Sequence, residues 1–240
     1  MVEVKICGVC RPEDARSAAD AGAAWVGVIL APDRTRTRTI TEAAAIFAAS
    51  TARRVGVFVD PPLQRVIDAV RELALDAVQL HGDESIDQVH RIRDGVACEI
   101  WKAIRVKDEA DLTRGVGLYG GHVAAILLDG WSPDAHGGAG VSFDWKAVAE
   151  AGLAGMIAGS GELAHAPEPA VGTSAVRDAP AVLRLIVAGG LTPGNVAEAV
   201  ALLNTAVVDV SSGVEVAPGR KSPGKIHAFV AAARGNGDSS

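Results

Sequence analysis

The sequence lacks a surplus of positive charge, a long apolar segment and a signal for secretion. Lys and Arg number 23 against 29 Asp and Glu, so the formal net charge is −6. This balance argues against nucleic acid as a partner, because phosphate backbones require a basic surface. The longest apolar candidate, Gly22 to Ala31, is about half as long as a membrane span. The N-terminus has no basic stretch before an apolar run, so we expect a cytoplasmic protein without contact to membranes.

Cysteine is scarce, with only Cys7, Cys10 and Cys98. An odd number without a secretory signal argues against a disulfide framework. Each thiol is then either a small core residue or a reactive group. No second Cys/His pair has the spacing of zinc ligands, and we expect no metal.

Although aromatic residues make up only 4% of the chain, 49% of its 240 residues are hydrophobic, which suffices for a sizeable core. Short runs rich in Val, Ile, Leu and Ala recur, and helical patterns follow them. The runs are Val2–Cys7, Ala24–Leu30, Arg54–Val59, Asp76–Leu80, Cys98–Ile104, Val123–Asp129, Leu185–Ala188 and Ala206–Val210. The expected helices are Pro12–Ala21, a segment with Thr41 as N-cap to Ser50, Arg65–Leu73, a segment from about Glu84, Glu109–Gly115, Asp144–Ala151, Pro193–Leu203 and Pro223–Ala233.

Near-continuous apolar runs of this kind are typical of parallel strands buried on both faces. Their alternation with helices predicts an α/β protein, and eight units of about 30 residues predict a single (β/α)8 TIM barrel. A doubly wound open sheet is the competitor. It is disfavoured because Cys7–Gly8–Val9–Cys10 stands where its nucleotide-binding form has G-x-G-x-x-G.

One segment interrupts the rhythm of strands and helices. Residues from about 152 to 180 are rich in Gly, Ala, Pro and Ser, which predicts a long inserted loop before strand 7. We expect the barrel to span residues 1–234 without a second domain, and residues 235–240 to form a flexible tail. Ile157–Gly161 resembles a spare copy of a strand-end turn, so it is an alternative seventh strand.

Function in a TIM barrel lies at the C-terminal ends of the strands. That rule selects Cys7, Asp60, Gln79, His81, Lys102, Asp129, Gly189–Gly190 and Ser211–Gly213. The two Gly/Ser-rich turns follow the last two strands, where this fold often binds phosphate through backbone N–H groups. We therefore predict a small phosphorylated substrate. The alternative is that these glycines only allow the backbone to turn.

Specific strings of residues also occur in a fixed order along the chain. They are Lys5–Gly8, Glu13–Ala15, Val55–Phe58, Gln79–Gly82, Leu127–Asp129, Gly137–Gly140, Phe143–Trp145, Ala188–Leu191 and Val208–Glu215. In this order they resemble the phosphoribosylanthranilate isomerase family of tryptophan biosynthesis, over nearly the whole chain. The strings KICG and VDVSSGVE are the most specific of them.

The resemblance implies an Amadori rearrangement, an intramolecular aldose–ketose isomerisation of N-(5-phosphoribosyl)anthranilate. It implies Cys7 as general base and Asp129 as general acid. The thiol must therefore ionise, and the carboxyl must hold its proton at neutral pH. No organic cofactor is expected, because the substrate itself contains the nitrogen that forms the Schiff base.

The resemblance further implies the residues that hold the substrate. An Arg after the second strand takes the anthranilate carboxylate, since a guanidinium can donate two parallel hydrogen bonds. The loop offers Arg34, Arg36 and Arg38. Arg38 fits the family pattern, and Arg36 remains an alternative because the loop is about two residues longer than usual. His81 and Gln79 are expected near the substrate, with a structural role for His81 as the alternative. The implied phosphate-binding residues are Gly138, Gly140, Gly189, Gly190, Ser211, Ser212 and Gly213, and Asp209 has a supporting role.

Three other functions compete with this one. Cys7–Gly8–Val9–Cys10 is a C-x-x-C between a strand and a helix, the setting of a thioredoxin-like redox motif. A related barrel isomerase of the histidine pathway carries Asp in place of Cys7 and binds phosphate at both ends of its substrate. A non-catalytic scaffold on the same fold is the third alternative. We expect a monomer or homodimer, and association with other tryptophan-pathway enzymes stays open.

Overall fold

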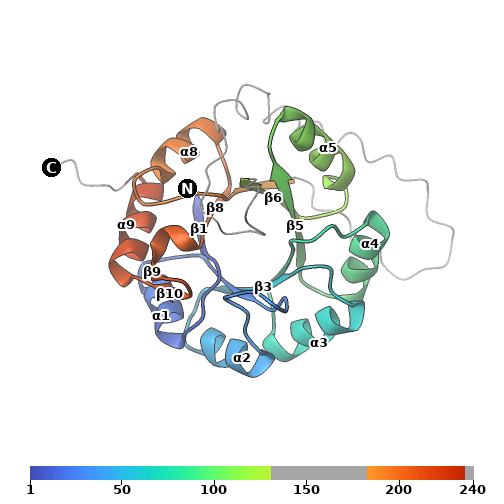
Figure 1. The fold of residues 1–240 in the computed structure, drawn as a ribbon, viewed down its shortest axis with the longest axis horizontal. Helices are drawn as coiled ribbons and strands as arrows, with labels where there is room; N and C mark the ends of the chain where they lie inside the picture. Colours follow the sequence, from blue (N-terminus) through green and yellow to red (C-terminus); the bar gives the residue numbers. More distant parts are fainter. Residues whose placement is uncertain (131–182, 236–240) are drawn as a thin grey trace.

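A computed structural model describes residues 1–130 and 183–235 of the chain. Eight parallel strands form a closed barrel in the order β1 to β8, and helices surround it (Figure 1). The strands are β1 Glu3–Ile6, β2 Trp25–Ile29, β3 Arg53–Phe58, β4 Ala77–Leu80, β5 Glu99–Val106, β6 Ala125–Gly130, β7 Arg184–Val187 and β8 Val207–Val210. The helices are α1 Pro12–Asp20, α2 Ile40–Ala48, α3 Leu63–Leu73, α4 Ile86–Gly95, α5 Glu109–Tyr119, α8 Val196–Leu203 and α9 Pro223–Ala233. The predicted (β/α)8 barrel and its eight strands are confirmed.

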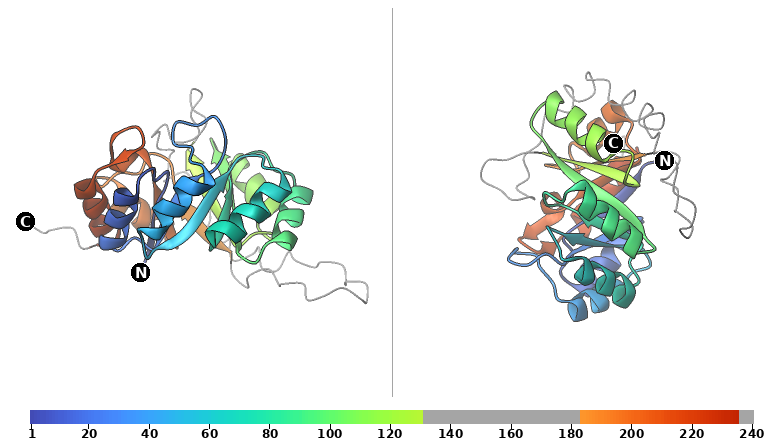
Figure 2. Two further views of the ribbon diagram at one scale, coloured as in Figure 1. Left: turned by 90° about the horizontal axis from the view of Figure 1, so that it is seen from below. Right: turned by 90° about the vertical axis from the view of Figure 1, so that its right-hand side faces the viewer.

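Side views show the helices flanking the wall of the barrel (Figure 2). A short 3-10 helix, η1 (Ser212–Val214), follows β8, and β9 (Glu215–Ala217) pairs antiparallel with β10 (Arg220–Lys221). No helix within residues 1–130 and 183–235 is long and apolar enough to cross a membrane. The expected helix Asp144–Ala151, the inserted loop at about 152–180 and the alternative strand Ile157–Gly161 lie outside the described residues, as do residues 236–240 of the expected tail.

Alternation along the strands divides the core into two clusters. Side chains that point out of the barrel pack under the helices, whereas the inner cluster is Trp25, Val55, Ala77, Trp101, Ala103, Ala125, Leu127, Ile186, Ala188 and Val207. Trp25 and Trp101 meet edge to face inside the barrel, with ring centroids 4.6 Å apart. Because strand side chains alternate with a period of two, the next inward positions beyond this cluster lie at the mouth. These positions are Cys7, His81, Arg105, Asp129 and Asp209.

Several element boundaries differ from the sequence-based expectation. Helix α2 begins at Ile40, and its N-cap is Thr39, which forms a capping box with Glu42. The expectation of Thr41 as the N-cap was therefore wrong. Helix α4 begins at Ile86 after Ser85 as N-cap, so Glu84 lies before the helix. Strand β5 runs to Val106, two residues beyond the predicted end, which changes the residues at the mouth.

Candidate active site

Strands β1 and β8 hold Cys7 in a buried cluster of charges. Lys5 is fully buried, and its Nζ lies 2.9 Å from Oδ1 of Asp209, its register partner on β8. A Cβ added at Gly27 would lie 3.2 Å from both Cys7 Sγ and Lys5 Nζ, so the sulfur and the ammonium converge over that glycine. The ammonium therefore faces both the carboxylate and the thiol.

A second ion network lies above Cys7, where Glu215 begins strand β9. Arg36 donates two hydrogen bonds to Glu215, of 2.8 and 2.7 Å. Lys221 Nζ contacts Glu215 Oε1 at 2.9 Å and the carbonyl oxygen of Ser211 at 3.0 Å. Burial acts to raise the pKa of Glu215, but Arg36 and Lys221 together hold it below the ordinary value.

The charges around the sulfur explain how a thiolate can exist there. Burial raises the pKa of Cys7, and the Asp209 carboxylate raises it further, while Lys5 and Lys221 act in the opposite direction. Arg36 also interacts electrostatically with Cys7. Lys5, Lys221 and Arg36 bring three positive charges against the two negative charges of Asp209 and Glu215, so 3 − 2 leaves +1. Ionised Cys7 would make this cluster neutral, yet burial and Asp209 outweigh the two lysines, so the pKa of the Cys7 thiol is raised.

The opposite wall of the mouth holds Asp129 on β6. This carboxyl group is only 7% exposed. His81 Nε2 lies 3.1 Å from Asp129 Oδ2, and Gln79 Nε2 lies 2.9 Å from His81 Nδ1. Gln79 is 1% exposed, so it lies behind His81 and its side chain does not reach the mouth. The expectation that both residues border the substrate therefore fits His81 better than Gln79.

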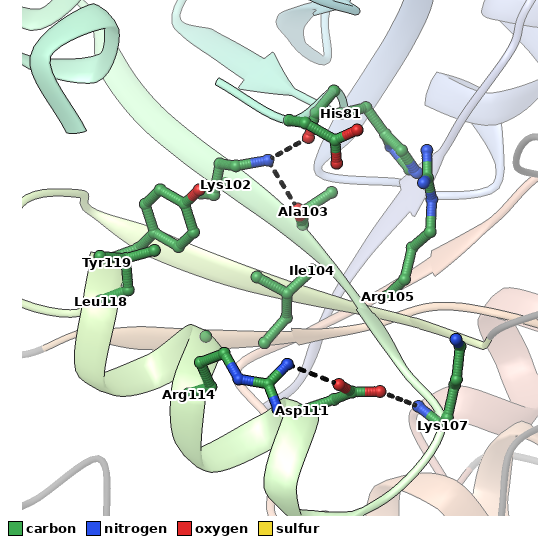
Figure 3. A pocket seen from close by; sticks show the side chains of 13 residues that line it. His81, Lys102, Ala103, Ile104, Arg105, Lys107, Asp111, Arg114, Leu118 and Tyr119 are labelled. Carbon is green, nitrogen blue, oxygen red and sulfur yellow. Dashed lines mark hydrogen bonds and ion pairs between the residues drawn. The ribbon is translucent and has the colours of Figure 1, made fainter. Parts of the chain in front are cut away.

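A pocket of about 330 Å³ opens beside the ends of β4 and β5. Its lining includes His81, Arg105 and Tyr119, and Arg105 extends alongside His81 in Figure 3. Arg105 is exposed and is the register partner of Asp129. Among the described residues its guanidinium has no hydrogen bond or ion pair, so this cation faces the mouth of the barrel without a protein anion.

Two strand-end residues selected from the sequence serve the framework instead. Lys102 points out of the barrel and forms a buried ion pair with Glu84, with 3.0 Å between Nζ and Oε2. Asp60 accepts a hydrogen bond of 2.8 Å from the backbone N–H of Asp83. Because β5 is longer than expected, Arg105 rather than Lys102 is its inward residue at the mouth. Continuing the alternation of inward and outward side chains one residue beyond the predicted end of the strand would have identified Arg105.

The two candidate arginines of the loop after β2 have different partners. Arg36 is engaged by Glu215. Arg38 donates from Nε to the carbonyl oxygen of Cys10 at 3.1 Å and from Nη1 to the carbonyl oxygen of Thr37. Within the described ranges Arg38 has no carboxylate partner, so its charge is available to a bound anion.

The glycines of the last two turns are required by close backbone approach. Gly189 and Gly190 have φ values of +80° and +64°, a region that favours glycine. A Cβ at Gly189 would lie 2.4 Å from the Gly130 nitrogen, and one at Gly213 would lie 1.9 Å from the Leu191 oxygen. These contacts support the reading of glycines that let the backbone turn, and phosphate binding by Gly189, Gly190, Ser211, Ser212 and Gly213 stays a prediction. Gly138 and Gly140 lie outside the described residues.

Sequence reasoning missed the ionic partners of Cys7. Lys5 was seen only as part of a motif, and Glu215 and Lys221 belong to a hairpin that was not predicted. The inward parity of Lys5, two residues before Cys7, was the available signal. In residues 1–130 and 183–235 no group of three or more His, Cys, Asp or Glu side chains could hold a metal ion.

Comparisons with known proteins give one consistent result. The sequence profile of a family described as N-(5'phosphoribosyl)anthranilate (PRA) isomerase matches residues 4–163 and 170–232. A relative from Geobacter sulfurreducens, named N-(5'-phosphoribosyl)anthranilate isomerase, is 39% identical over 237 residues, which cover 98% of this chain and 100% of the relative. The crystal structure of phosphoribosyl anthranilate isomerase from Thermotoga maritima has a TM-score of 0.79 and 31% identity, covering 98% of this chain and all of that one. A crystal structure of such an isomerase with reduced 1-(o-carboxyphenylamino)-1-deoxyribulose 5-phosphate has a TM-score of 0.74 and 30% identity, with coverage of 98% and 100%.

Proposed function

The chain belongs to the N-(5'-phosphoribosyl)anthranilate isomerase family, and on that premise we propose that Cys7 and Asp129 are the base and the acid of its reaction. The activity is the conversion of N-(5'-phosphoribosyl)anthranilate into 1-(2-carboxyphenylamino)-1-deoxyribulose 5-phosphate in tryptophan biosynthesis. The observation that carries the assignment is the pair of inward positions. Cys7 follows β1 and Asp129 is the second-to-last residue of β6, and both face the same mouth with opposite electrostatic surroundings.

The first step opens the ribose ring. Asp129 gives its proton to the ring oxygen while the bond from that oxygen to C1 breaks and the substrate nitrogen forms a double bond to C1. The product is a protonated Schiff base with a free hydroxyl, and Asp129 becomes a carboxylate. Its hydrogen bond to His81 stabilises the negative charge that it acquires.

The second step removes a proton from the sugar. The Cys7 thiolate takes the proton from C2, the C–H electron pair forms a double bond between C1 and C2, and the nitrogen recovers its lone pair. The resulting enolamine becomes the ketone when its hydroxyl gives a proton to the Asp129 carboxylate and C1 takes one from the Cys7 thiol, which restores both groups. Lys5 and Lys221 favour the thiolate that starts this step. No proton is gained or lost overall.

The remaining substrate groups have candidate partners. Arg38 binds the anthranilate carboxylate, because unlike Arg36 it has no carboxylate partner among the described residues. The phosphate lies over the turns after β7 and β8, against Gly190 and Ser211 to Gly213, as in many barrels of this kind. We further propose one barrel domain over residues 1–234, a cytoplasmic location, and a monomer or homodimer. Association with other tryptophan-pathway enzymes stays open.

A fluorescence assay with purified protein tests the assignment of acid and base. Substrate and product both contain the anthranilate group and should differ in emission. Cys7→Ser and Asp129→Asn should each lower kcat by on the order of 100-fold or more, since general acid–base groups contribute ~10²–10⁴. Cys10→Ser is the matched control, because this thiol makes only long contacts of 3.5 and 3.8 Å to carbonyl oxygens. Full activity in either Cys7→Ser or Asp129→Asn would refute the assignment.

The same assay separates the competing functions. A C-x-x-C redox protein would need both Cys7 and Cys10, so loss of isomerisation in Cys10→Ser would favour it. A histidine-pathway isomerase needs a second phosphate site, and turnover of its aminoaldose substrate at a comparable kcat/KM would reveal a dual-substrate enzyme. A scaffold on this fold would turn over neither substrate.

A further inference from the structure

We propose that Gln79 is a positioning residue that fixes the tautomer of His81 and thereby determines which oxygen of Asp129 carries the acidic proton. The proposal rests on the function proposed above, because it assumes that Asp129 is the acid. Gln79 would act through His81 alone, without touching the substrate. Gln79 would thus assist the acid without carrying a charge, whereas charged side chains surround Cys7.

The geometry forms a chain of three side chains across the wall of the barrel. Gln79 and His81 both point inward from the end of β4, and Asp129 points inward from β6. The contacts are 2.9 Å from Gln79 Nε2 to His81 Nδ1 and 3.1 Å from His81 Nε2 to Asp129 Oδ2. Gln79 is buried by its neighbours, whereas His81 is partly exposed and lines the pocket in Figure 3. Only His81 and Asp129 are therefore accessible to a substrate.

The donor character of the Gln79 amide nitrogen determines the direction of both hydrogen bonds between these three side chains. An amide nitrogen can only donate a hydrogen bond, so Nδ1 of His81 must accept it. A neutral imidazole that accepts at Nδ1 carries its hydrogen on Nε2, which then donates to Oδ2 of Asp129. Oδ2 is occupied as an acceptor, and Oδ1 is left to hold the transferable proton. Oδ1 faces the turn after β7, where a Cβ at Gly189 would lie 3.2 Å away.

A second observation concerns the other end of the amide. Gln79 Oε1 is buried and has no hydrogen-bond partner among the described residues. Turning the amide over would direct Oε1 at Nδ1 and bury an NH2 group, with two hydrogens, where one oxygen now lies unpaired. In either orientation one end of the buried amide lacks a partner, and the structure places the donor nitrogen at His81. Gln79 Oε1 therefore lacks a hydrogen bond because the amide directs its donor nitrogen at His81.

The hydrogen bond from Gln79 occupies the lone pair of His81 Nδ1. Protonation of the imidazole would require a hydrogen on Nδ1, the atom at which the Gln79 N–H is aimed. A neutral imidazole donates to Asp129 without placing a full positive charge beside it. A charged imidazolium would favour the carboxylate form and remove the proton that opens the ribose ring.

The isosteric change Gln79→Glu reverses the polarity of the first contact. A carboxylate at this position accepts from Nδ1–H, and its buried negative charge favours the imidazolium, which carries hydrogens on both nitrogens. Asp129 would then lose its proton at lower pH. We expect kcat at neutral pH to fall by on the order of 100-fold, because general acid catalysis is lost. The alkaline limb of the kcat–pH profile should move to lower pH, while KM changes little. Gln88→Glu is the matched control, since Gln88 is the third residue of the α4 capping box, where Glu serves equally well.

Nitrogen NMR of 15N-histidine-labelled protein tests the tautomer directly. The His81 signals, identified by their loss in His81→Asn, should show a bare Nδ1 and a protonated Nε2 in the wild type, and protonation at both nitrogens in Gln79→Glu. A protonated Nδ1 in the wild type would overturn the proposal, and so would a kcat–pH profile of Gln79→Glu that matches the control. If Gln79→Glu does not fold, Gln79→Met removes the donor at similar volume and should yield a mixture of tautomers; an unchanged tautomer there would also overturn the proposal. Full activity in Asp129→Asn would instead refute the acid assignment and leave the tautomer result unaffected.

Discussion

Replacing Lys5 with Met removes the positive charge nearest to Cys7 while keeping most of the side-chain volume. Lys5 is fully buried, and its Nζ lies 2.9 Å from Asp209, so the variant leaves a buried carboxylate without its partner. Breaking a buried pair in this way costs roughly 3–5 kcal/mol of the free energy of unfolding. Against a typical total of about 5–15 kcal/mol, the variant should still fold at 25 °C.

The effect on the thiol is separable from the effect on stability. Burial and Asp209 already raise the pKa of Cys7, and Lys5 is the first of the groups that oppose them. Losing an adjacent opposite charge should raise the pKa further. At a given pH below the pKa, the thiolate fraction falls by the same factor as the acid dissociation constant. We therefore expect kcat/KM near pH 7.5 to fall roughly 10- to 1000-fold.

The expected pH dependence of kcat/KM follows from the rise in the pKa of Cys7. The thiolate is the active form, so kcat/KM of the wild type should rise with pH beyond the ordinary thiol pKa of about 8.5, and Lys5→Met should move this rise to higher pH. Alkylation by iodoacetamide in a Cys10→Ser/Cys98→Ser background reports the thiolate of Cys7 without turnover. The double variant Lys5→Met/Asp209→Leu should recover most of the lost stability, because an apolar pair replaces the ion pair, yet remain slow. An alkylation midpoint in Lys5→Met equal to that of the background protein would refute this account.

Three further predictions follow from single contacts. Arg105→Ala should raise KM for the anionic substrate by up to about fivefold, because the exposed guanidinium faces the mouth. Initial rates of this variant and of Arg16→Ala, which removes another exposed arginine, check the prediction. Equal KM values in the two variants would contradict it. Arg38→Met should raise KM more than it lowers stability, whereas Arg36→Met, which breaks a buried ion pair, should do the reverse; urea unfolding and initial rates of both variants decide between them. Burial raises the pKa of Cys98 to about 11, so the unfolded chain loses this proton first and the free energy of unfolding should decline as pH rises from about 8.5 to 11. Cys98→Ser should remove that decline, on the order of 1 kcal/mol after solvent screening, in urea titrations at pH 7 and 10.

The barrel was predictable because its signal repeats along the chain. Each strand buried on both faces is a short apolar run, and the alternation of strand and helix predicts parallel neighbours. Boundaries were less predictable, because a polar residue can extend a strand when its side chain reaches the open mouth. Arg105 is such a residue, and the apolar run that predicted β5 ends just before it. Thr39 and Thr41 are both good caps by type, and only the reach of Glu42 back to Thr39 decides between them.

The site was likewise predictable where its residues follow apolar strands and unpredictable where contacts join different elements. Cys7 and Asp129 were found because they follow apolar strands at their C-terminal ends, where barrels carry function. Lys5 was not predicted as a partner of Cys7, because a lysine within an apolar strand does not fit the pattern of a buried strand. Its register partner, Asp209, becomes evident only in the folded barrel. Glu215 and Lys221 meet only when the chain folds back as a hairpin, because they lie on the paired strands β9 and β10. Pairing between charges on different elements is a property of the fold, and periodicity in one segment carries little information about it.

The reaction requires a proton distribution that is the reverse of the ordinary one. Carboxyl groups usually ionise near pH 3.9 and thiols near 8.5, yet the proposed mechanism needs a protonated Asp129 and an ionised Cys7 together. Around the sulfur, burial and Asp209 raise the pKa of the thiol, and Lys5 and Lys221 oppose that rise. Beside the carboxyl, Gln79 donates to His81 and His81 donates to Asp129 in the proposed tautomer, so neither side chain brings a charge to the acid.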